Sequence, residues 1–150
     1  MGSKIKRYHV ERGSIEPEDL ISGAIKFEVA IPIIVDKQSV TSDTLATLEG
    51  YAKWKLSNFK SDYIDYIYVE LEYESAGAGD VDLYNVSDSS KIKDLVAPTA
   101  AQSHTITRVD VTTEMKAITS EKTIGIQAAG DGTNALTVYS AKLIIVMSFS

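Results

Sequence analysis

Residues 24–35 read AIKFEVAIPIIV, and the alternation in this stretch decides the fold class. Its odd positions, from Ile25 to Val35, are all apolar, whereas the even positions include two charged residues and Pro32. A period of two over this length predicts a β-strand that buries one face. Because proline cannot donate a hydrogen bond to a neighbouring strand, Pro32 indicates the edge of a sheet, or a bulge or bend at that point.

Further extended stretches, separated by turn signals, follow along the chain. We expect strands at 51–59, 63–74, 81–86, 91–96, 105–109, 123–128 and 136–149. The last of these has apolar side chains on both faces, with Tyr139 and Leu143 on one and Val138 and Ile144 on the other, which is typical of a central or covered strand. Short strands at regular intervals predict an all-β fold, a two-sheet antiparallel sandwich that is jelly-roll-like.

Two stretches predict helix instead of strand. Residues 16–23 have Pro17 near their start, acidic residues in the first turn and a glycine at the end, so they predict a short helix. Residues 110–120 can hold one or two helical turns capped by Asp110 or Thr112, and such a turn crosses the open end of many sandwiches.

Length and composition fit one globular domain. The 150 residues are 44% hydrophobic and 24% charged, which is enough to bury a core without covalent cross-links. We expect an N-terminal arm and short helix in residues 1–23 and a β-sandwich domain in residues 24–150, while residues 40–49 fit either strand or helix. The absence of cysteine excludes disulfides and thiolate catalysis, and few Asn and Gln with abundant Ile favour a thermophilic source.

The charge is uneven along the chain. Residues 1–12 carry four basic side chains and one acidic side chain, a balance of +3, which leaves −9 for the rest of a chain whose total is −6. An acidic body repels phosphate backbones, so nucleic acid is not an expected partner. No apolar run reaches the length that a bilayer requires, and the first residues lack a signal-peptide pattern, so we expect neither a membrane partner nor secretion.

Groups suited to catalysis are sparse. His9 and His104 are the only histidines and fall in different segments, so they cannot form a triad or a three-histidine metal site. Carboxylate pairs such as Asp80/Asp82 could in principle share acid and base roles. Acidic residues that alternate along a strand more often form its solvated face, and we therefore expect a protein that is not an enzyme.

Calcium is the cofactor that the sequence leaves open. Hard cations need several carboxylate and carbonyl oxygens that converge from loops, and Asp80, Asp82 and Asp131 lie in segments that offer them. Neither segment, 79–82 or 130–134, matches the twelve-residue calcium loop with its closing glutamate. Asp-Gly and Gly-Asp pairs also serve simply as turns. We therefore expect no cofactor, with calcium at these residues as the alternative.

Several residues on outer strand faces are candidates for an interface. Ile34, Ile144 and Val146 are apolar where the pattern predicts an outward side chain, so they need a cover from the N-terminal segment or from a neighbouring subunit. Tyr66 and Tyr68 alternate on the polar face of their strand, and partner contact and ordinary cross-strand packing explain them equally well. The expected partner is the chain itself in a cyclic homo-oligomer such as a trimer.

The basic arm is a second candidate for an interface. Lys4, Lys6, Tyr8 and Val10 alternate with other side chains, including Arg7, in a pattern that can add a strand to a sheet edge. Its positive charge suits an acidic neighbour. We expect the arm to dock on a neighbouring subunit or on another protein of the same particle, the alternative being a disordered terminus.

Two segments resemble parts of known proteins. Residues 13–25, GSIEPEDLISGAI, look like the segments that lead from a short arm into the β-domain of appendage and capsid-surface proteins of phages and archaeal viruses. Residues 138–146, VYSAKLIIV, are similar to the last strand of jelly-roll domains in such virion proteins and in secreted tube-forming proteins of hyperthermophiles. The resemblance implies a structural, self-assembling role and transfers no functional residue. Without a signal peptide, it favours a virion assembled in the cytoplasm.

Three classes of function therefore remain. A virion or other assembly subunit explains the basic arm, the doubly apolar last strand and the scarcity of catalytic groups. A carbohydrate-binding or adhesion module requires Tyr66, Tyr68 or Trp54 exposed in a groove, and a tube- or filament-forming subunit is a further variant of assembly. An enzyme requires a pocket with two converging carboxylates.

Overall fold

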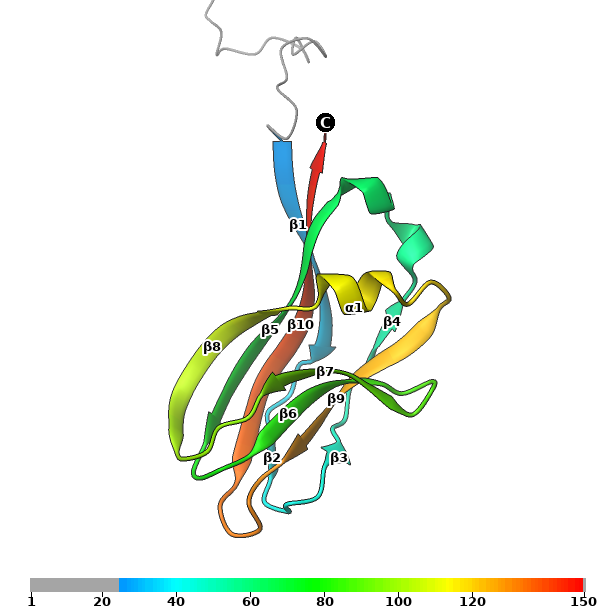
Figure 1. Ribbon diagram of the computed structural model, residues 1–150. Coiled ribbons are helices and arrows are strands. Elements are labelled where there is room, and N and C mark those ends of the chain that lie inside the picture. The colour runs from blue at the N-terminus through cyan, green and yellow to red at the C-terminus, as the bar shows by residue number, and fades with distance from the viewer. Residues whose placement is uncertain (1–24, 150) are drawn as a thin grey trace, which may run out of the picture.

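Two antiparallel sheets pack face to face in the computed structural model, which describes residues 25–149 (Figure 1). The first sheet contains, in spatial order, β1 (Ile25–Ile34), β10 (Leu136–Phe149), β5 (Ile64–Ser75) and β8 (Gln102–Asp110), and β2 (Gln38–Val40) also pairs with β10. The second contains β3 (Ala46–Thr47), β9 (Lys122–Ala129), β6 (Asp80–Asn85) and β7 (Ser90–Val96), and β4 (Ala52–Trp54) also pairs with β9. The predicted sandwich is confirmed.

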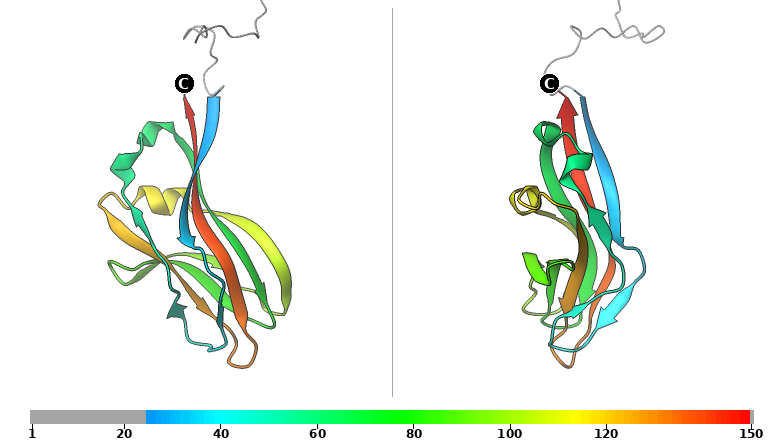
Figure 2. Two further views of the ribbon diagram at one scale, coloured as in Figure 1. Left: turned by 180° about the vertical axis from the view of Figure 1, so that it is seen from behind. Right: turned by 90° about the vertical axis from the view of Figure 1, so that its right-hand side faces the viewer.

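The connections between the sheets are those of a jelly roll. β3 and β4 pair with successive parts of β9 and act together as one interrupted strand. Counted in this way, and with the short β2 left out, the eight strands have the orders 1-8-3-6 in the first sheet and 2-7-4-5 in the second, which is the jelly-roll arrangement. Every connection crosses between the sheets except that from β6 to β7. The two sheets enclose the core in a flattened body whose layers are visible edge-on (Figure 2).

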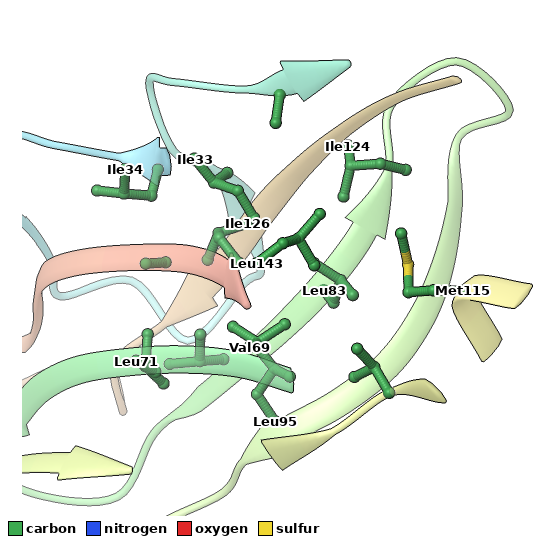
Figure 3. Close-up of a cluster of buried hydrophobic side chains, with 14 of the residues drawn as sticks. Ile33, Ile34, Val69, Leu71, Leu83, Leu95, Met115, Ile124, Ile126 and Leu143 are labelled. Atoms are coloured by element: carbon green, nitrogen blue, oxygen red, sulfur yellow. The ribbon is translucent and has the colours of Figure 1, made fainter. Parts of the chain in front are cut away.

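The core lies between the facing sides of the two sheets. Val69, Leu71 and Leu143 from the first sheet meet Leu83 and Ile126 from the second (Figure 3), and none of these side chains retains measurable exposure. Alternation of buried and exposed positions along β5 produces this packing, as the sequence pattern predicts. No helix of the described residues is long and apolar enough to cross a membrane.

Short helices close one end of the sandwich. The expected strand at 51–59 ends at Trp54 and continues as two 3-10 turns, η2 (Leu56–Asn58) and η3 (Ser61–Tyr63). The expected helical turn is α1 (Thr112–Lys116), and the Asp110 carboxylate accepts a hydrogen bond from the Thr112 amide at 2.9 Å. The fully buried Trp54 indole donates to the carbonyls of Met115 and Ile118 at 3.1 and 3.2 Å. The indole thus links β4 to the region of α1.

A register shift in β1 changes which of its side chains are buried. β1 is an edge strand, and its pairing with β10 slips by one residue between Pro32 and Ile34, so both interpretations of Pro32 are confirmed. Because the bulge adds one residue to β1, the residues after it point to the opposite faces from those that the alternation predicts. Ile34 therefore lies in the core with 1% exposure, and Val35 is 72% exposed. The predictions that Ile34 faces outward and Val35 inward are wrong.

A second bulge exchanges the faces of two residues in β10. The pairing of β10 with β5 shifts between Val138 and Ser140, so Tyr139 is an extra residue. Val138 is buried in the core, whereas Tyr139 is partly exposed and stacks on His104, at 4.4 Å between ring centroids. The predicted faces of Val138 and Tyr139 are therefore reversed. The ambiguous residues 40–49 contain the short strand β3 within loops.

Two glycines test how closely the β1 bulge packs. Gly50 has φ of +117°, and a Cβ there would collide with the Ile33 carbonyl oxygen in the bulge. Gly132 has φ of +91°, but its nearest neighbours lie 4.0 Å from an added Cβ. We expect Gly50→Ala to lower the free energy of unfolding by about 3 kcal/mol and Gly132→Ala by about 1 kcal/mol, as measured by urea denaturation. Equal losses would mean that backbone conformation alone, and not the close contact, requires Gly50.

Candidate functional site

The outer face of the first sheet carries a bridge of charged side chains. The Arg108 guanidinium on β8 donates from Nε to Glu70 Oε1 on β5 at 2.9 Å. Its Nη1 and Nη2 donate to the two carboxylate oxygens of Glu28 on β1 at 3.0 and 3.1 Å. A forked arrangement of this kind is among the stronger charge-assisted hydrogen bonds. Because β10 and β5 separate β8 from β1, the bridge reaches across the sheet from one edge strand to the other.

This bridge passes over Ile144. Arg108, Glu70 and Lys142 are cross-strand partners in one line across the sheet. Glu28, Val146 and Tyr66 form another such line, and the line between these two contains Ala30, Ile144 and Tyr68. The Arg108 guanidinium carbon lies 5.9 Å from the Tyr68 ring centroid. Ile144 faces outward, as predicted, yet it is only 3% exposed and is not part of the core cluster.

The cover over Ile144 therefore belongs to the same chain, and Ile144 needs no neighbouring subunit to bury it. Among the predicted outer-face residues, Ile34 lies in the core, and Tyr68 and Val146 are partly buried. Tyr66 is 49% exposed and stacks on Tyr68 with ring centroids 5.6 Å apart. The structure thus leaves Tyr66 as the most accessible member of that set.

Two partly exposed apolar side chains lie at the beginning of β1, and other exposed apolar side chains include Val35 and Ile106. Ile25 and Phe27 are 40% and 39% exposed, although the alternation predicts that both are buried. The ends of β1 and β10 project beyond the second sheet, which does not extend far enough to cover them (Figure 2). Within residues 25–149, no strand pairs with the outer side of β1. Periodicity identified the correct face, but it contains no information on where the opposite sheet ends.

The basic arm cannot be placed in this arrangement. Its residues Lys4, Lys6, Arg7, Tyr8 and Val10 lie outside the described residues, and so does His9. The short helix predicted for residues 16–23 lies outside them as well.

An acidic cluster occupies the outer face of the second sheet. Asp80 and Asp82 lie two residues apart on β6, and Asp94 on β7 pairs directly with Asp82. One carboxylate oxygen from each residue lies within 4.8 Å of those of the other two. Sequence reasoning identified the first two residues and missed Asp94, because the pairing depends on a register shift between β6 and β7.

Asp131 does not belong to this cluster. Its Oδ1 accepts hydrogen bonds from the backbone amides of Thr133 and Asn134 at 2.9 and 2.6 Å, and Asn134 Nδ2 donates to its Oδ2 at 3.0 Å. These bonds lower the pKa of Asp131 to about 2. Asp131 thus stabilises the turn at residues 131–134.

Asp82 is the unusual member of the acidic cluster. It is 1% exposed, and its Oδ1 has no hydrogen-bond partner among the described residues. Burial, and after it the charge of Asp80, raises the pKa of Asp82 to about 6. The Lys91 ammonium lies 2.6 Å from Asp94 Oδ1, which lowers the pKa of Asp94. The Asp82 carboxylate is thus held away from water, while those of Asp80 and Asp94 lie on the accessible side of the cluster.

His104 lies on the first sheet, away from these aspartates. Its Nε2 is 2.5 Å from Glu72 Oε2, and its ring stacks on Tyr139. An open hollow of about 520 Å³ lies beside it, lined by residues that include Glu74, Gln102 and Thr137. The Glu70 and Glu72 carboxylates do not converge, because Glu70 binds Arg108 and Lys142 while Glu72 contacts His104.

Comparisons with known proteins leave the fold as the basis for classification. No family model matches the sequence, and no curated protein matches it closely enough to count as a relative. Jelly-roll sandwiches support many unrelated functions, so the fold does not select among them. The surfaces described above must therefore carry the functional argument.

The acidic cluster leads to a prediction about pH. Below pH 3.8, the ordinary pKa of an aspartate, the raised pKa of Asp82 does not lower the free energy of unfolding, because the carboxyl group is protonated in both the folded and the unfolded chain. Between pH 3.8 and about 6, the folded protein retains a proton that the unfolded chain releases, so the free energy of unfolding falls as pH rises. Above pH 6 this loss of stability is complete. In EDTA at about pH 7.5, Asp82→Asn should therefore raise the free energy of unfolding by about 1–2 kcal/mol, less than two pKa units would imply, because water screens the open side of the cluster.

Urea denaturation at about pH 4 and pH 7.5 checks this expectation. Wild-type protein should lose more stability than Asp82→Asn between the two values. The exposed Asp36, whose side chain makes no hydrogen bond within residues 25–149, provides the matched control Asp36→Asn, which should follow the wild type. Parallel behaviour of Asp82→Asn and wild type would show that burial of Asp82 carries no electrostatic cost.

Proposed function

We propose that this protein is a non-enzymatic structural subunit that self-assembles into a virion or similar particle, with the β1 edge and the basic N-terminal segment as its contact surfaces. The observation that carries the proposal is the partly exposed apolar surface of Ile25 and Phe27 on an edge strand. An edge strand presents backbone donors and acceptors to a further strand, and apolar side chains beside it favour such addition.

A second copy of β1 fits this edge in chemical terms. If two β1 strands pair antiparallel with Phe27 opposite its own copy, Ile25 meets Val29 and Lys26 meets Glu28. Apolar groups then face apolar groups, and opposite charges lie in direct cross-strand positions. Pro32 falls beyond the paired residues, so its missing amide hydrogen does not interrupt the added ladder. This geometry supports a closed, two-fold contact between copies.

The basic segment supports assembly for a different reason. Its charge of +3 opposes a remainder of −9, so attraction between the segment of one copy and the body of another is favourable at low salt. The resemblance of residues 13–25 and 138–146 to virion proteins agrees with a particle as the product. Other proteins of that particle are further partners under this proposal.

Light scattering on the full-length protein tests the β1 contact. The wild type should have a mass that is a multiple of the monomer mass, and Phe27→Lys should dissociate it, because the substitution sets two ammonium groups against each other. The matched control is Val35→Lys, at an apolar residue that is 72% exposed outside the strands and should have no effect. A wild-type monomer at tens of micromolar protein would refute the proposal, as would a Phe27→Lys oligomer of unchanged mass and melting temperature.

Deletion of residues 1–12 tests the basic segment separately. The truncated protein should keep its melting temperature but assemble more weakly, and added salt should weaken assembly of the full-length protein more than that of the truncated one. Equal assembly of both proteins at every salt concentration would leave the β1 edge as the sole proposed contact.

Carbohydrate binding is the second candidate, favoured by the half-exposed Tyr66 and by the hollow beside the stacked His104 and Tyr139. Aromatic faces flanked by carboxylates are typical of surfaces that bind sugars. Trp54 cannot contribute, because it is completely buried. Glycan-array binding that is lost in Tyr66→Ala or Tyr139→Ala, and retained in the exposed control Tyr51→Ala, would favour this class over assembly.

A further inference from the structure

We propose that Asp80, Asp82 and Asp94 bind one divalent cation of the calcium type on the outer face of the second sheet. The geometry is the first support. Calcium binds oxygen at about 2.3–2.6 Å, so two oxygens that share one ion lie no more than about 5 Å apart. The carboxylates of these three residues meet that condition without movement of the backbone.

The unpaired oxygen of Asp82 is an independent reason to expect a ligand. Asp82 is 1% exposed, its Oδ1 lacks a hydrogen-bond partner among the described residues, and its carboxylate belongs to the converging set. A buried carboxylate oxygen with no partner is costly. A bound cation supplies the missing interaction, whereas an ordinary solvated strand face would leave no such oxygen out of contact with water.

The charges of the cluster match a divalent ion. Three ionised aspartates carry −3, and Lys91, which lies 2.6 Å from Asp94 Oδ1, reduces the local charge to −2. Gln127 on β9, which pairs with Asp82, and Tyr84 on β6, which pairs with Lys91, add no charge. Lys93 also acts on Asp94 electrostatically, but its ammonium is paired with Glu114 at 3.0 Å.

The arrangement favours calcium over magnesium. Magnesium keeps several of its waters and uses one or two carboxylates in strict octahedral geometry, whereas calcium accepts more carboxylates in flexible geometry. Asp94 is on the exposed side of the cluster, so water can complete the coordination there. The ion would join β6 to β7, an edge strand whose register with β6 shifts twice.

Proton sharing between Asp82 and Asp94 is the competing explanation. In that case, the buried carboxyl group would be neutral and would donate to Asp94, and the cluster would have no use for a metal ion. The two explanations differ in their response to calcium, because only a cluster that binds the ion releases heat and gains stability when calcium is added.

Isothermal titration of CaCl2 into EDTA-treated, dialysed full-length protein at about pH 7.5 and near-physiological salt distinguishes them. We expect one ion per chain, a rise in melting temperature with CaCl2, and weaker binding of MgCl2. Asp82→Asn and the surface variant Asp94→Asn should each weaken calcium binding at least about tenfold, whereas Asp36→Asn should bind as the wild type does. Asp82→Asn should also melt higher than wild type in EDTA and gain nothing from CaCl2.

Two results would overturn the proposal. One is the absence of both heat and a melting shift at millimolar CaCl2, which would leave proton sharing as the explanation of the cluster. The other is unchanged calcium affinity in both Asp82→Asn and Asp94→Asn, which would place any bound ion elsewhere. Neither result would affect assembly through β1, because that surface belongs to the other sheet.

Discussion

The structure depends on β10, which is buried along its inner face and, at Ile144, on its outer face as well. This strand pairs with β1, β2 and β5, so every register in the first sheet except that between β5 and β8 involves it. Its inward side chains, among them Leu143 and Ile145, enter the core, while Ile144 on the opposite face is closed off by a charged bridge. A one-residue slip of β10 would exchange these environments, and the hydrophobic effect therefore holds the whole sheet in register.

The two sheets differ in length, and this difference determines which apolar residues of the first sheet are buried and which are partly exposed. Where the second sheet covers the first, apolar positions of β1 and β5 are core residues. Past the end of that cover, the same alternation along β1 leaves Ile25 and Phe27 partly exposed. The partly exposed and the buried apolar residues of β1 thus belong to one continuous pattern, and the boundary of the opposite sheet separates them.

The sequence was informative where regular alternation decides the structure, as in β5 and most of β1, and it identified the antiparallel sandwich. Pro32 indicated the bulge beside it, but the pattern did not show that this bulge buries Ile34 and exposes Val35. The bulge at Tyr139 could not be located, because an extra residue leaves composition and average period unchanged. The sequence indicated Asp80 and Asp82 through their spacing on one strand. It missed Asp94, and it missed the contact of Arg108 with Glu28, because both depend on which strands become neighbours.

The contact of Arg108 with Glu28 also affects how readily β1 could leave its own sheet. Domain swapping requires a terminal strand to leave its own sheet and take the same place in another molecule. Here the first described strand is tied at Glu28 to the opposite edge strand, and Lys26 adds a contact of 2.9 Å to Asp65 on β5. Release of β1 must therefore break ionic contacts as well as its ladder with β10. These contacts therefore favour retention of β1 in its own sheet.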